Sequence, residues 1–206
     1  MTFAEIKIQA LKLMFTSYED DLKPEDLSEK HFDPNYKSYL VNMNGAINRC
    51  LADIERRRVL SPRVCVIDAD KLTHGKFHPR FSLDDIPDFF DVESVICERE
   101  DGMIGACPWR REGNTLILND YRSDAEYRLL YHRKIEPITD ADDSGVVDLP
   151  SAIVAAIPYF VKGDLFREDN EDEASVARNW YEATMSGVET PSSGVQTRVK
   201  SVYTQV

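Results

Sequence analysis

The residues of this sequence that come nearest to a metal-binding motif lie between positions 140 and 151, "DADDSGVVDLPS". Asp140, Asp142 and Ser144 occupy positions one, three and five of a twelve-residue calcium loop, and a glycine follows at position six. Such a loop ends in a glutamate that binds the ion through both carboxylate oxygens, but Ser151 stands there instead. The pattern therefore favours a solvated turn over a calcium site.

Two histidines four residues apart, His74 and His78, could bind a metal ion from one face of a helix. Gly75 and Pro79 oppose a helix at this point, so the spacing favours a surface loop. No nucleophile elbow, glycine-rich phosphate loop or paired cysteine and histidine of a hydrolase occurs in the sequence. We therefore expect no catalytic residue, no metal site and no cofactor.

The densest group of acidic residues follows the most apolar run of the chain, residues 152–161. The five carboxylates are Glu168, Asp169, Glu171, Asp172 and Glu173. A solvated turn that caps the next helix is the simplest interpretation, because acidic side chains stabilise a helix N-terminus. A functional use of these carboxylates requires an assembly with other molecules.

Large apolar and aromatic side chains on both sides of this acidic run are candidates for a core or for a subunit interface. They are Ile153, Ile157, Phe160, Trp180 and Tyr181. Aromatic side chains dominate binding energy at interfaces. Trp180 nevertheless stands at helical spacing beside Ala174 and Ala177, which favours a core position. The sequence leaves both interpretations open.

The composition indicates a folded protein without a strong affinity for nucleic acid. The chain has 206 residues, 42% hydrophobic and 30% charged, which suits one domain or one domain with an elaborate insertion. Its formal net charge of −12 argues against a broad basic surface for phosphates. The four cysteines form no C-x-x-C pair, so buried thiols in a reducing compartment are expected. The longest apolar run is half the length of a membrane span, so no membrane segment is expected.

Two helices are expected at the start of the chain, because apolar residues recur there at three- and four-residue steps. The first covers residues 2–17, where Thr2 and Glu5 have the spacing of a capping box. The second starts near Asp33, which can cap it, and ends in the arginines of residues 56–58, whose charge suits a helix C-terminus. Its inward-facing stripe is expected to consist of Tyr36, Leu40, Met43, Ile47, Cys50 or Leu51, and Ile54.

Two more helices are expected toward the end of the chain. The third follows residue 150, with Asp148 or Ser151 as its cap and a kink at Pro158. It is apolar on nearly every side, so it must lie centrally or between subunits. The fourth covers residues 171–185 and ends at a Ser-Gly pair.

Between the second and third helices the period changes to the alternation typical of strands. Five strands are expected, at residues 63–69, 91–99, 103–109, 115–120 and 125–133. Turn signals between the last four predict a meander of antiparallel hairpins. Residues 74–88 match no pattern, so no structure is predicted for them.

The last residues, 188–206, lack helical periodicity and alternate valine with polar residues. This predicts an extended arm that can add to a partner as a strand, with a disordered tail as the alternative. We therefore expect an α+β fold. It would consist of a helical bundle from residues 1–62 and 140–187, a small antiparallel β-sheet inserted at residues 63–139, and the C-terminal arm.

The order of these parts resembles the head-to-tail connector, or adaptor, proteins of tailed bacteriophages. The matching features are an N-terminal helical pair, the return segment "YHRKIEPITDADD" (131–143) and the stretch "VVDLPSAIVAAIPYFVKGDLFREDNEDEASVARNWYEAT" (146–184). The last stretch has the Leu-Pro start, apolar helix, acidic turn and aromatic closing helix of that family. The resemblance covers about residues 3–187 and leaves residues 74–88 without a counterpart.

The resemblance implies a structural virion protein that is not an enzyme. Its copies would form a ring, usually of twelve, that docks on the portal protein, extends the DNA channel and joins the head to the next neck or tail protein. The ring would be assembled in the host cytoplasm and lie in the virion neck, where double-stranded DNA passes without sequence-specific binding. The acidic residues 168–173 would line or rim the channel, where like charge lets DNA pass without sticking.

By the same resemblance, the C-terminal arm is expected to dock on the portal protein by strand addition. The residues expected to make this contact are Val195, Arg198, Val199, Lys200, Val202 and Tyr203. Two of them are basic and would suit an acidic groove on the portal.

Two other classes of protein stay open. A tail completion or terminator protein would also be acidic and ring-forming, but such families usually begin with a strand-rich domain and lack a closing helical pair. A cytoplasmic acidic regulator or DNA mimic would need carboxylates along one elongated face, whereas the carboxylates here are scattered between expected helices and turns.

Overall fold

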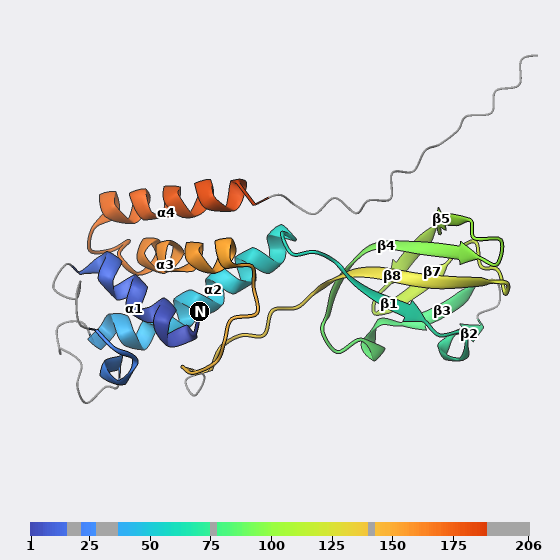
Figure 1. The fold of residues 1–206 in the computed structure, drawn as a ribbon, viewed down its shortest axis with the longest axis horizontal. Coiled ribbons are helices and arrows are strands. Elements are labelled where there is room, and N and C mark those ends of the chain that lie inside the picture. The colour runs from blue at the N-terminus through green and yellow to red at the C-terminus, as the bar shows by residue number, and fades with distance from the viewer. Residues whose placement is uncertain (16–21, 28–36, 75–77, 140–142, 189–206) are drawn as a thin grey trace, which may run out of the picture. The chain divides into compact units, whose positions relative to one another are not determined.

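The computed structural model describes five stretches of the chain, residues 1–15, 22–27, 37–74, 78–139 and 143–188. The chain divides into two compact units. Unit 1 contains the described residues of the segments 1–59 and 135–188, and unit 2 contains those of Leu60–Lys134. The α-helices belong to unit 1 and two small antiparallel sheets belong to unit 2, so the predicted α+β class is confirmed (Figure 1).

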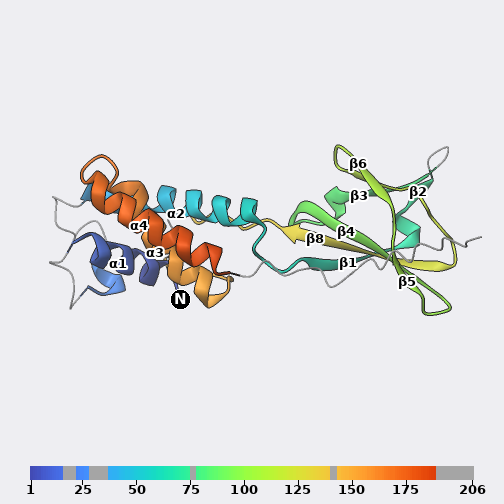
Figure 2. The same ribbon diagram turned by 90° about the horizontal axis from the view of Figure 1, so that it is seen from above.

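Unit 1 is built around one apolar helix. The helices of this unit are α1 (Phe3–Met14), the short 3-10 helix η2 (Pro24–Leu27), α2 (Lys37–Arg57), α3 (Ser151–Leu165) and α4 (Glu171–Ser186). Helix α3 packs against α1, α2 and α4 (Figures 1 and 2). With neighbours on three sides, it buries Ile153, Val154, Ile157 and Val161. This explains why its sequence is apolar around most of its circumference.

The first two helices follow their sequence signals closely. Thr2 Oγ1 accepts a hydrogen bond from the Glu5 amide (3.2 Å), and a Glu5 carboxylate oxygen accepts one from the Thr2 amide (2.7 Å), so the predicted capping box is confirmed. Helix α1 ends at Met14, earlier than predicted. The predicted start of the second helix at Asp33 lies outside the described residues. The buried face of α2 includes Met43 and Ile54, as its spacing predicts.

The predicted cap of α3 is wrong. Neither Asp148 nor Ser151 caps the helix; Ser151 is its first residue, and Pro150 holds the N-cap position without a side-chain hydrogen bond. The Pro150 carbonyl accepts hydrogen bonds from the amides of Ile153 (2.9 Å) and Val154 (3.0 Å). The helix continues through Pro158 to Leu165.

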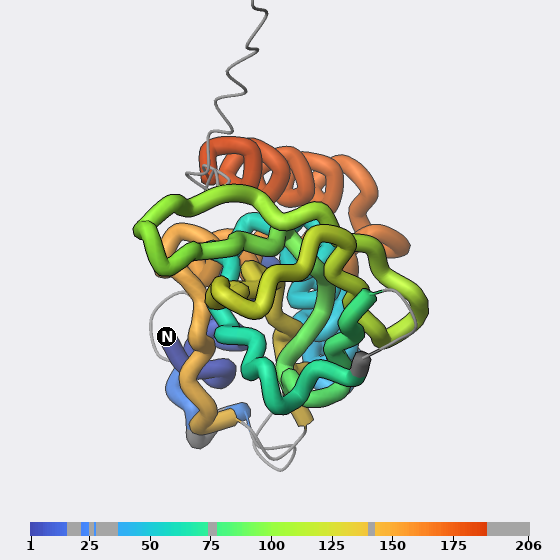
Figure 3. The backbone as a smooth tube through the Cα atoms, turned by 90° about the vertical axis from the view of Figure 1, so that its right-hand side faces the viewer, coloured from blue at the N-terminus to red at the C-terminus, as the bar shows by residue number. Residues whose placement is uncertain are grey.

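Unit 2 contains two four-stranded antiparallel sheets that share one core. One sheet has the order β1 (Arg63–Ile67), β8 (Ala125–Arg133), β4 (Phe89–Arg99), β5 (Ile104–Ala106). The other has the order β2 (Thr73–His74), β3 (Pro79–Ser82), β7 (Thr115–Leu118), β6 (Trp109–Glu112). Two short 3-10 helices, η4 (Ala69–Lys71) and η5 (Leu83–Asp85), join strands. Buried residues from both sheets, such as Phe81, Leu116 and Leu129, form a single cluster. Figure 3 shows the backbone of these strands, coloured from teal through green to yellow.

The prediction of one meander is therefore wrong. Residues 103–109 were expected as one strand, but they divide into β5 and the start of β6, which belong to different sheets. Pro108 separates the two strands, because proline has no amide to continue a ladder. Strand β8 pairs with β1 and β4, not with β7, and the unassigned residues 74–88 supply β3.

Strand β4 shows why simple alternation misjudges a strand. Its pairing with β8 shifts register between Phe89 and Asp91 and again between Val92 and Ser94. The buried residues Phe89, Val92 and Val95 therefore recur at three-residue steps. The strand begins at Phe89, two residues before its predicted start.

Candidate functional site

Helix α4 carries the most distinctive surface of unit 1. Ala174, Ala177 and Tyr181 are buried against the rest of the unit, whereas Val176 and Trp180 are 56% and 60% exposed. At its start, the Asn170 side chain accepts a hydrogen bond from the Glu173 amide (3.2 Å) and so caps the helix. One charged and one apolar hollow border this helix.

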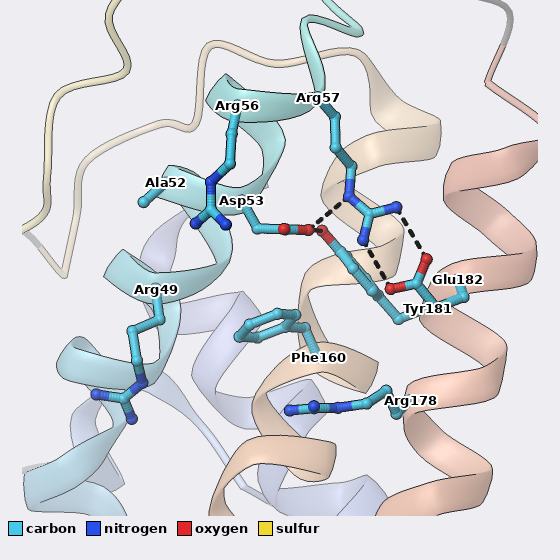
Figure 4. A pocket seen from close by; sticks show the side chains of 9 residues that line it. All are labelled: Arg49, Ala52, Asp53, Arg56, Arg57, Phe160, Arg178, Tyr181 and Glu182. Carbon is cyan, nitrogen blue, oxygen red and sulfur yellow. Dashed lines mark hydrogen bonds and ion pairs between the residues drawn. The ribbon is translucent and has the colours of Figure 1, made fainter.

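The charged hollow lies between α2 and α4, with α3 beneath it (Figure 4). Its lining residues are Arg49, Ala52, Asp53, Arg56, Arg57, Phe160, Arg178, Tyr181 and Glu182. Four of these nine side chains are arginines, in a chain whose formal net charge is −12. The hollow is therefore a local reversal of the overall charge.

A hydrogen-bonded network holds one side of the charged hollow. The Arg57 guanidinium donates to both carboxylate oxygens of Glu182 (2.7 and 2.8 Å) and to Asp53 (2.6 Å). These hydrogen bonds, with Glu182 contributing most, raise the pKa of Arg57. The Tyr181 hydroxyl donates to the same Asp53 oxygen (2.8 Å). Burial, followed by the nearby Cys50 and Asp53, raises the pKa of Tyr181 far above its ordinary value, so this hydroxyl remains a donor.

The other arginines of the charged hollow differ in their pairing. Arg49 is paired with Asp164, and its Nε donates across 3.1 Å. The Arg178 guanidinium lies 6.0 Å from the centroid of the Phe160 ring, a cation–π arrangement. Arg178 and Arg56 form no ion pair with any of the residues that the structure describes. In Figure 4 the Arg56 and Arg178 side chains are drawn on either side of the Phe160 ring, whereas the Arg49 guanidinium points away from it.

The apolar hollow lies where α4 meets α1 and α3. Its lining residues are Leu13, Tyr159, Lys162, Asp172, Glu173, Val176, Ala177 and Trp180. The rings of Tyr159 and Trp180 lie 6.4 Å apart between centroids. Lys162 donates to the Leu13 carbonyl (2.6 Å) and pairs with Glu173 (2.7 Å), so its charge is neutralised within the hollow. The surface of the apolar hollow that a partner could contact is therefore mainly apolar and aromatic.

The structure separates the five candidate core or interface residues. Ile153, Ile157 and Tyr181 are buried, Phe160 is half-buried, and the Phe160 ring contacts the Tyr181 ring edge-on at 5.0 Å between centroids. Trp180 is exposed and is not part of the core, so for this residue only the interface interpretation stays a prediction.

All five residues of the acidic run are exposed at the turn between α3 and α4 and in the first turn of α4. Two of them have partners inside unit 1: Asp169 accepts a hydrogen bond from the Tyr39 hydroxyl, and Glu173 pairs with Lys162. The other three carboxylates of the acidic run are Glu168, Glu171 and Asp172. The structure brings the run beside the apolar hollow, which Asp172 and Glu173 help to line.

Other candidates from the sequence are only partly described. The arm residues Val195 to Tyr203, like Asp140 and Asp142 of the calcium-like loop, lie outside the described residues. His74 belongs to β2. Across residues 1–15, 22–27, 37–74, 78–139 and 143–188, no group of three or more His, Cys, Asp or Glu side chains could hold a metal ion.

The charged hollow was missed by sequence reasoning. Asp53 and Arg57 have the i,i+4 spacing of a helical ion pair, and Arg49 and Arg56 stand two turns apart on the same helix. These signals identify one face of α2, but Arg178 comes from a helix more than a hundred residues further along the chain. Only the packing of α2 against α3 and of α3 against α4 brings them together.

Comparisons with known proteins add no relative: no model of a known protein family matches the chain, and no curated protein does. Within the described residues, no helix combines the length and apolar character that crossing a membrane requires. The charged and apolar hollows are therefore the features from which a function is argued.

Proposed function

We propose that this protein is a structural virion protein of a tailed bacteriophage, a ring-forming head-to-tail adaptor that docks on the portal protein. In this proposal the helices from both ends of the chain form a bundle, and residues 188–206 form an arm that contacts the portal. The ring extends the DNA channel and joins the head to the next neck or tail protein. The basis for the family is the sequence resemblance across about residues 3–187.

The observation that carries an assembly function is the exposed tryptophan beside the apolar hollow. Trp180 is 60% exposed and Val176 is 56% exposed on the outer face of α4, next to the Tyr159 ring. Tryptophan buries a large apolar area when it is covered and is enriched among the residues that dominate binding energy. Three apolar or aromatic side chains meet at this hollow, namely Tyr159, Val176 and Trp180. Such a grouping fits a surface that another protein covers.

Exposed apolar residues elsewhere fit the same function. In unit 2, Val64 and Val66 on β1 are 59% and 55% exposed, and Met103 and Ile104 at β5 are 61% and 64% exposed. Strands β1 and β5 are the two edges of their sheet. An edge strand offers unpaired backbone groups as well as side chains, so it is a natural site for another chain.

The proposal is tested by measuring the mass of the protein in solution, alone and mixed with the portal protein of the same phage, by light scattering after size exclusion. We expect a discrete ring-sized complex. Val176→Glu is expected to abolish it, because a carboxylate in the apolar hollow would lose its hydration when the partner binds.

Val41→Glu is the matched control for this substitution. Val41 is also a helical valine, 60% exposed, but it does not line the apolar hollow. We expect Val41→Glu to assemble like the unaltered chain. A chain that remains monomeric with the portal, or a Val176→Glu variant that assembles normally, would contradict the proposal.

A further inference from the structure

We propose that Arg56 and Arg178 of the charged hollow bind the acidic turn of a second copy of this chain. The acidic turn is defined by Glu168, Glu171 and Asp172, the exposed carboxylates near the start of α4. The inference rests on the proposed ring-forming function, and it identifies the contact between neighbouring subunits.

The charged hollow holds more guanidinium charge than its carboxylates neutralise. Arg57 is paired with both carboxylates that line the hollow, and Arg49 is paired with Asp164. Within the part of the chain that the structure describes, no carboxylate pairs with Arg56 or Arg178. These two side chains come from different helices and line the same hollow. A ligand with negative charge would complete the pairing.

The geometry of the hollow suits a carboxylate side chain. Guanidinium groups bind carboxylates and phosphates through two parallel hydrogen bonds. The hollow has a volume of about 320 Å³, at the small end of the range for ligand sites, roughly 300–1,000 Å³. The Arg178 guanidinium carbon lies 6.0 Å from the Phe160 ring centroid, and a cation–π contact of this kind does not use the N–H groups that would bind a carboxylate. One or two carboxylates from a protein segment fit this space.

The acidic turn of the same copy lies too far away to pair with Arg56, whereas Arg178 stands only seven residues, about 10 Å, beyond Glu171 on α4. The Tyr39 hydroxyl donates to Asp169, so the N-terminal end of α2 lies beside the acidic turn. Helix α2 then rises about 25 Å from Tyr39 to Arg56, at about 1.5 Å per residue. This distance exceeds the length of a glutamate side chain several times over. A carboxylate of the acidic turn that pairs with Arg56 must therefore come from a different molecule.

Two different patches on one unit produce a head-to-tail contact. Each copy presents the acidic turn at one end of α2 and the charged hollow near the other, so the contact is heterologous. Heterologous contacts close into rings when the rotation allows it. The contact would place Glu168, Glu171 and Asp172 in the subunit interface, not on the wall or rim of the channel, where the family resemblance would place them.

Double-stranded DNA is the competing occupant of the charged hollow. A phosphate fits a guanidinium as well as a carboxylate does. However, Asp53 and Glu182 line the same hollow, and the whole chain has a formal net charge of −12, so a long polyanion is repelled. A short acidic protein segment has far less charge to repel. The observations therefore favour the acidic turn.

The test uses charge reversal on the full-length chain. One variant is R56E/R178E and the other is E168K/E171K/D172K. Tested separately, each variant is expected to raise the dissociation constant for self-association by about tenfold or more, both in the absence and in the presence of the portal protein. The reason is that close charge pairs contribute strongly at interfaces. Mixed together, the two variants are expected to assemble again, since each then meets an oppositely charged partner. Mass is measured by light scattering, and association by sedimentation.

The controls separate folding from assembly. All five substituted residues are exposed, so circular dichroism and thermal melting should match the unaltered chain. R56Q/R178Q is a milder second variant in which the charge is removed but not reversed. K71E/R110E reverses two exposed cations of unit 2 that lie outside the edge strands β1 and β5, and it is expected to assemble normally.

The outcomes distinguish this inference from the proposed function. If the unaltered chain forms rings on the portal and R56E/R178E does so equally well, the contact is wrong and the adaptor function stands. If the unaltered chain remains monomeric with the portal, both are wrong. If R56E/R178E assembles normally but loses binding to a fluorescent DNA duplex, the charged hollow serves phosphates and the inference is overturned.

Discussion

At the scale of single residues, burial controls the chemistry of the thiols. All four cysteines are unpaired; Cys50 and Cys107 are buried, whereas Cys65 and Cys97 are half-buried. Burial raises the pKa of Cys50 to about 12 and that of Cys107 to about 11. Because the thiolate is the reactive form, both thiols are inert at neutral pH while the protein is folded.

The Cys50 thiol makes the stability of the protein depend on alkaline pH. In the folded chain it keeps its proton up to about pH 12, whereas its ordinary pKa is 9.0. Between these values the folded state binds more protons than the unfolded state. The free energy of unfolding therefore falls as pH rises, by up to about 1.4 kcal/mol per pH unit from this group.

Cys50→Ala is expected to reduce the fall in the free energy of unfolding as the pH rises. Urea unfolding with a reductant, at about pH 8 and about pH 10.5, measures the slope for each chain. Ile47→Val, another buried position of α2, should lower stability by about 1 kcal/mol at both pH values without changing the slope. An unchanged slope in Cys50→Ala would contradict the assignment to this thiol.

At the scale of elements, the approach of α3 to α4 depends on a glycine. A Cβ atom on Gly163 would lie 3.1 Å from the Ala174 carbonyl oxygen and 3.3 Å from the Arg178 amide nitrogen. Both atoms belong to the α4 backbone, which cannot move away without shifting the whole helix. Arg178 lines the charged hollow, so this close contact also positions the site.

Gly163→Ala is expected to destabilise the protein, although alanine favours a helix more than glycine. The overpacking costs about 1–3 kcal/mol. This overpacking cost exceeds the stabilisation of about 1 kcal/mol that alanine provides through its higher helix propensity. Denaturant unfolding should show a net loss of about 1 kcal/mol.

Gly45→Ala is the matched control on α2. A Cβ atom there meets only the end of the Arg49 side chain, at 3.3 Å, and that end can move. We expect this variant to gain about 0.5–1 kcal/mol. If both glycine substitutions stabilise the protein, α3 and α4 are farther apart at Gly163 than the 3.1 Å contact implies.

At the scale of the whole molecule, unit 2 has a hydrophobic core of its own. Its buried cluster draws on residues from Ile67 to Tyr131, and all of them belong to the Leu60–Lys134 segment. The Tyr127 hydroxyl accepts a hydrogen bond from the Arg122 amide (2.6 Å) and so closes the turn before β8. His132 is buried as well, with Nε2 lying 2.7 Å from a Glu93 carboxylate oxygen. These contacts lie within one segment.

A fragment of residues 60–134 is therefore expected to fold by itself. A domain of this size buries about 60% of its unfolded surface, which is marginal but sufficient for many small domains. Dispersed amide signals in a two-dimensional NMR spectrum would show folding. Leu129→Asp, at a fully buried position of β8, should remove that dispersion. A fragment without dispersion would mean that unit 2 requires the rest of the chain.

Features that depend on neighbours along the chain can be predicted from the sequence alone. The capping box of Thr2 and Glu5, the extent of α4 and the buried face of α2 were all predicted correctly. The reason is physical: helical hydrogen bonds join residues four apart, so apolar spacing and capping residues are visible locally.

Features that depend on distant residues are known only from the three-dimensional structure. It divided residues 103–109 between two sheets, shifted the register of β4, left Trp180 exposed and gathered arginines from α2 and α4 at one hollow. Each of these depends on which strand or helix lies opposite, and no local spacing contains that information. Trp180 illustrates the limit, because helical spacing beside two buried alanines does not reveal how wide the covered face of α4 is.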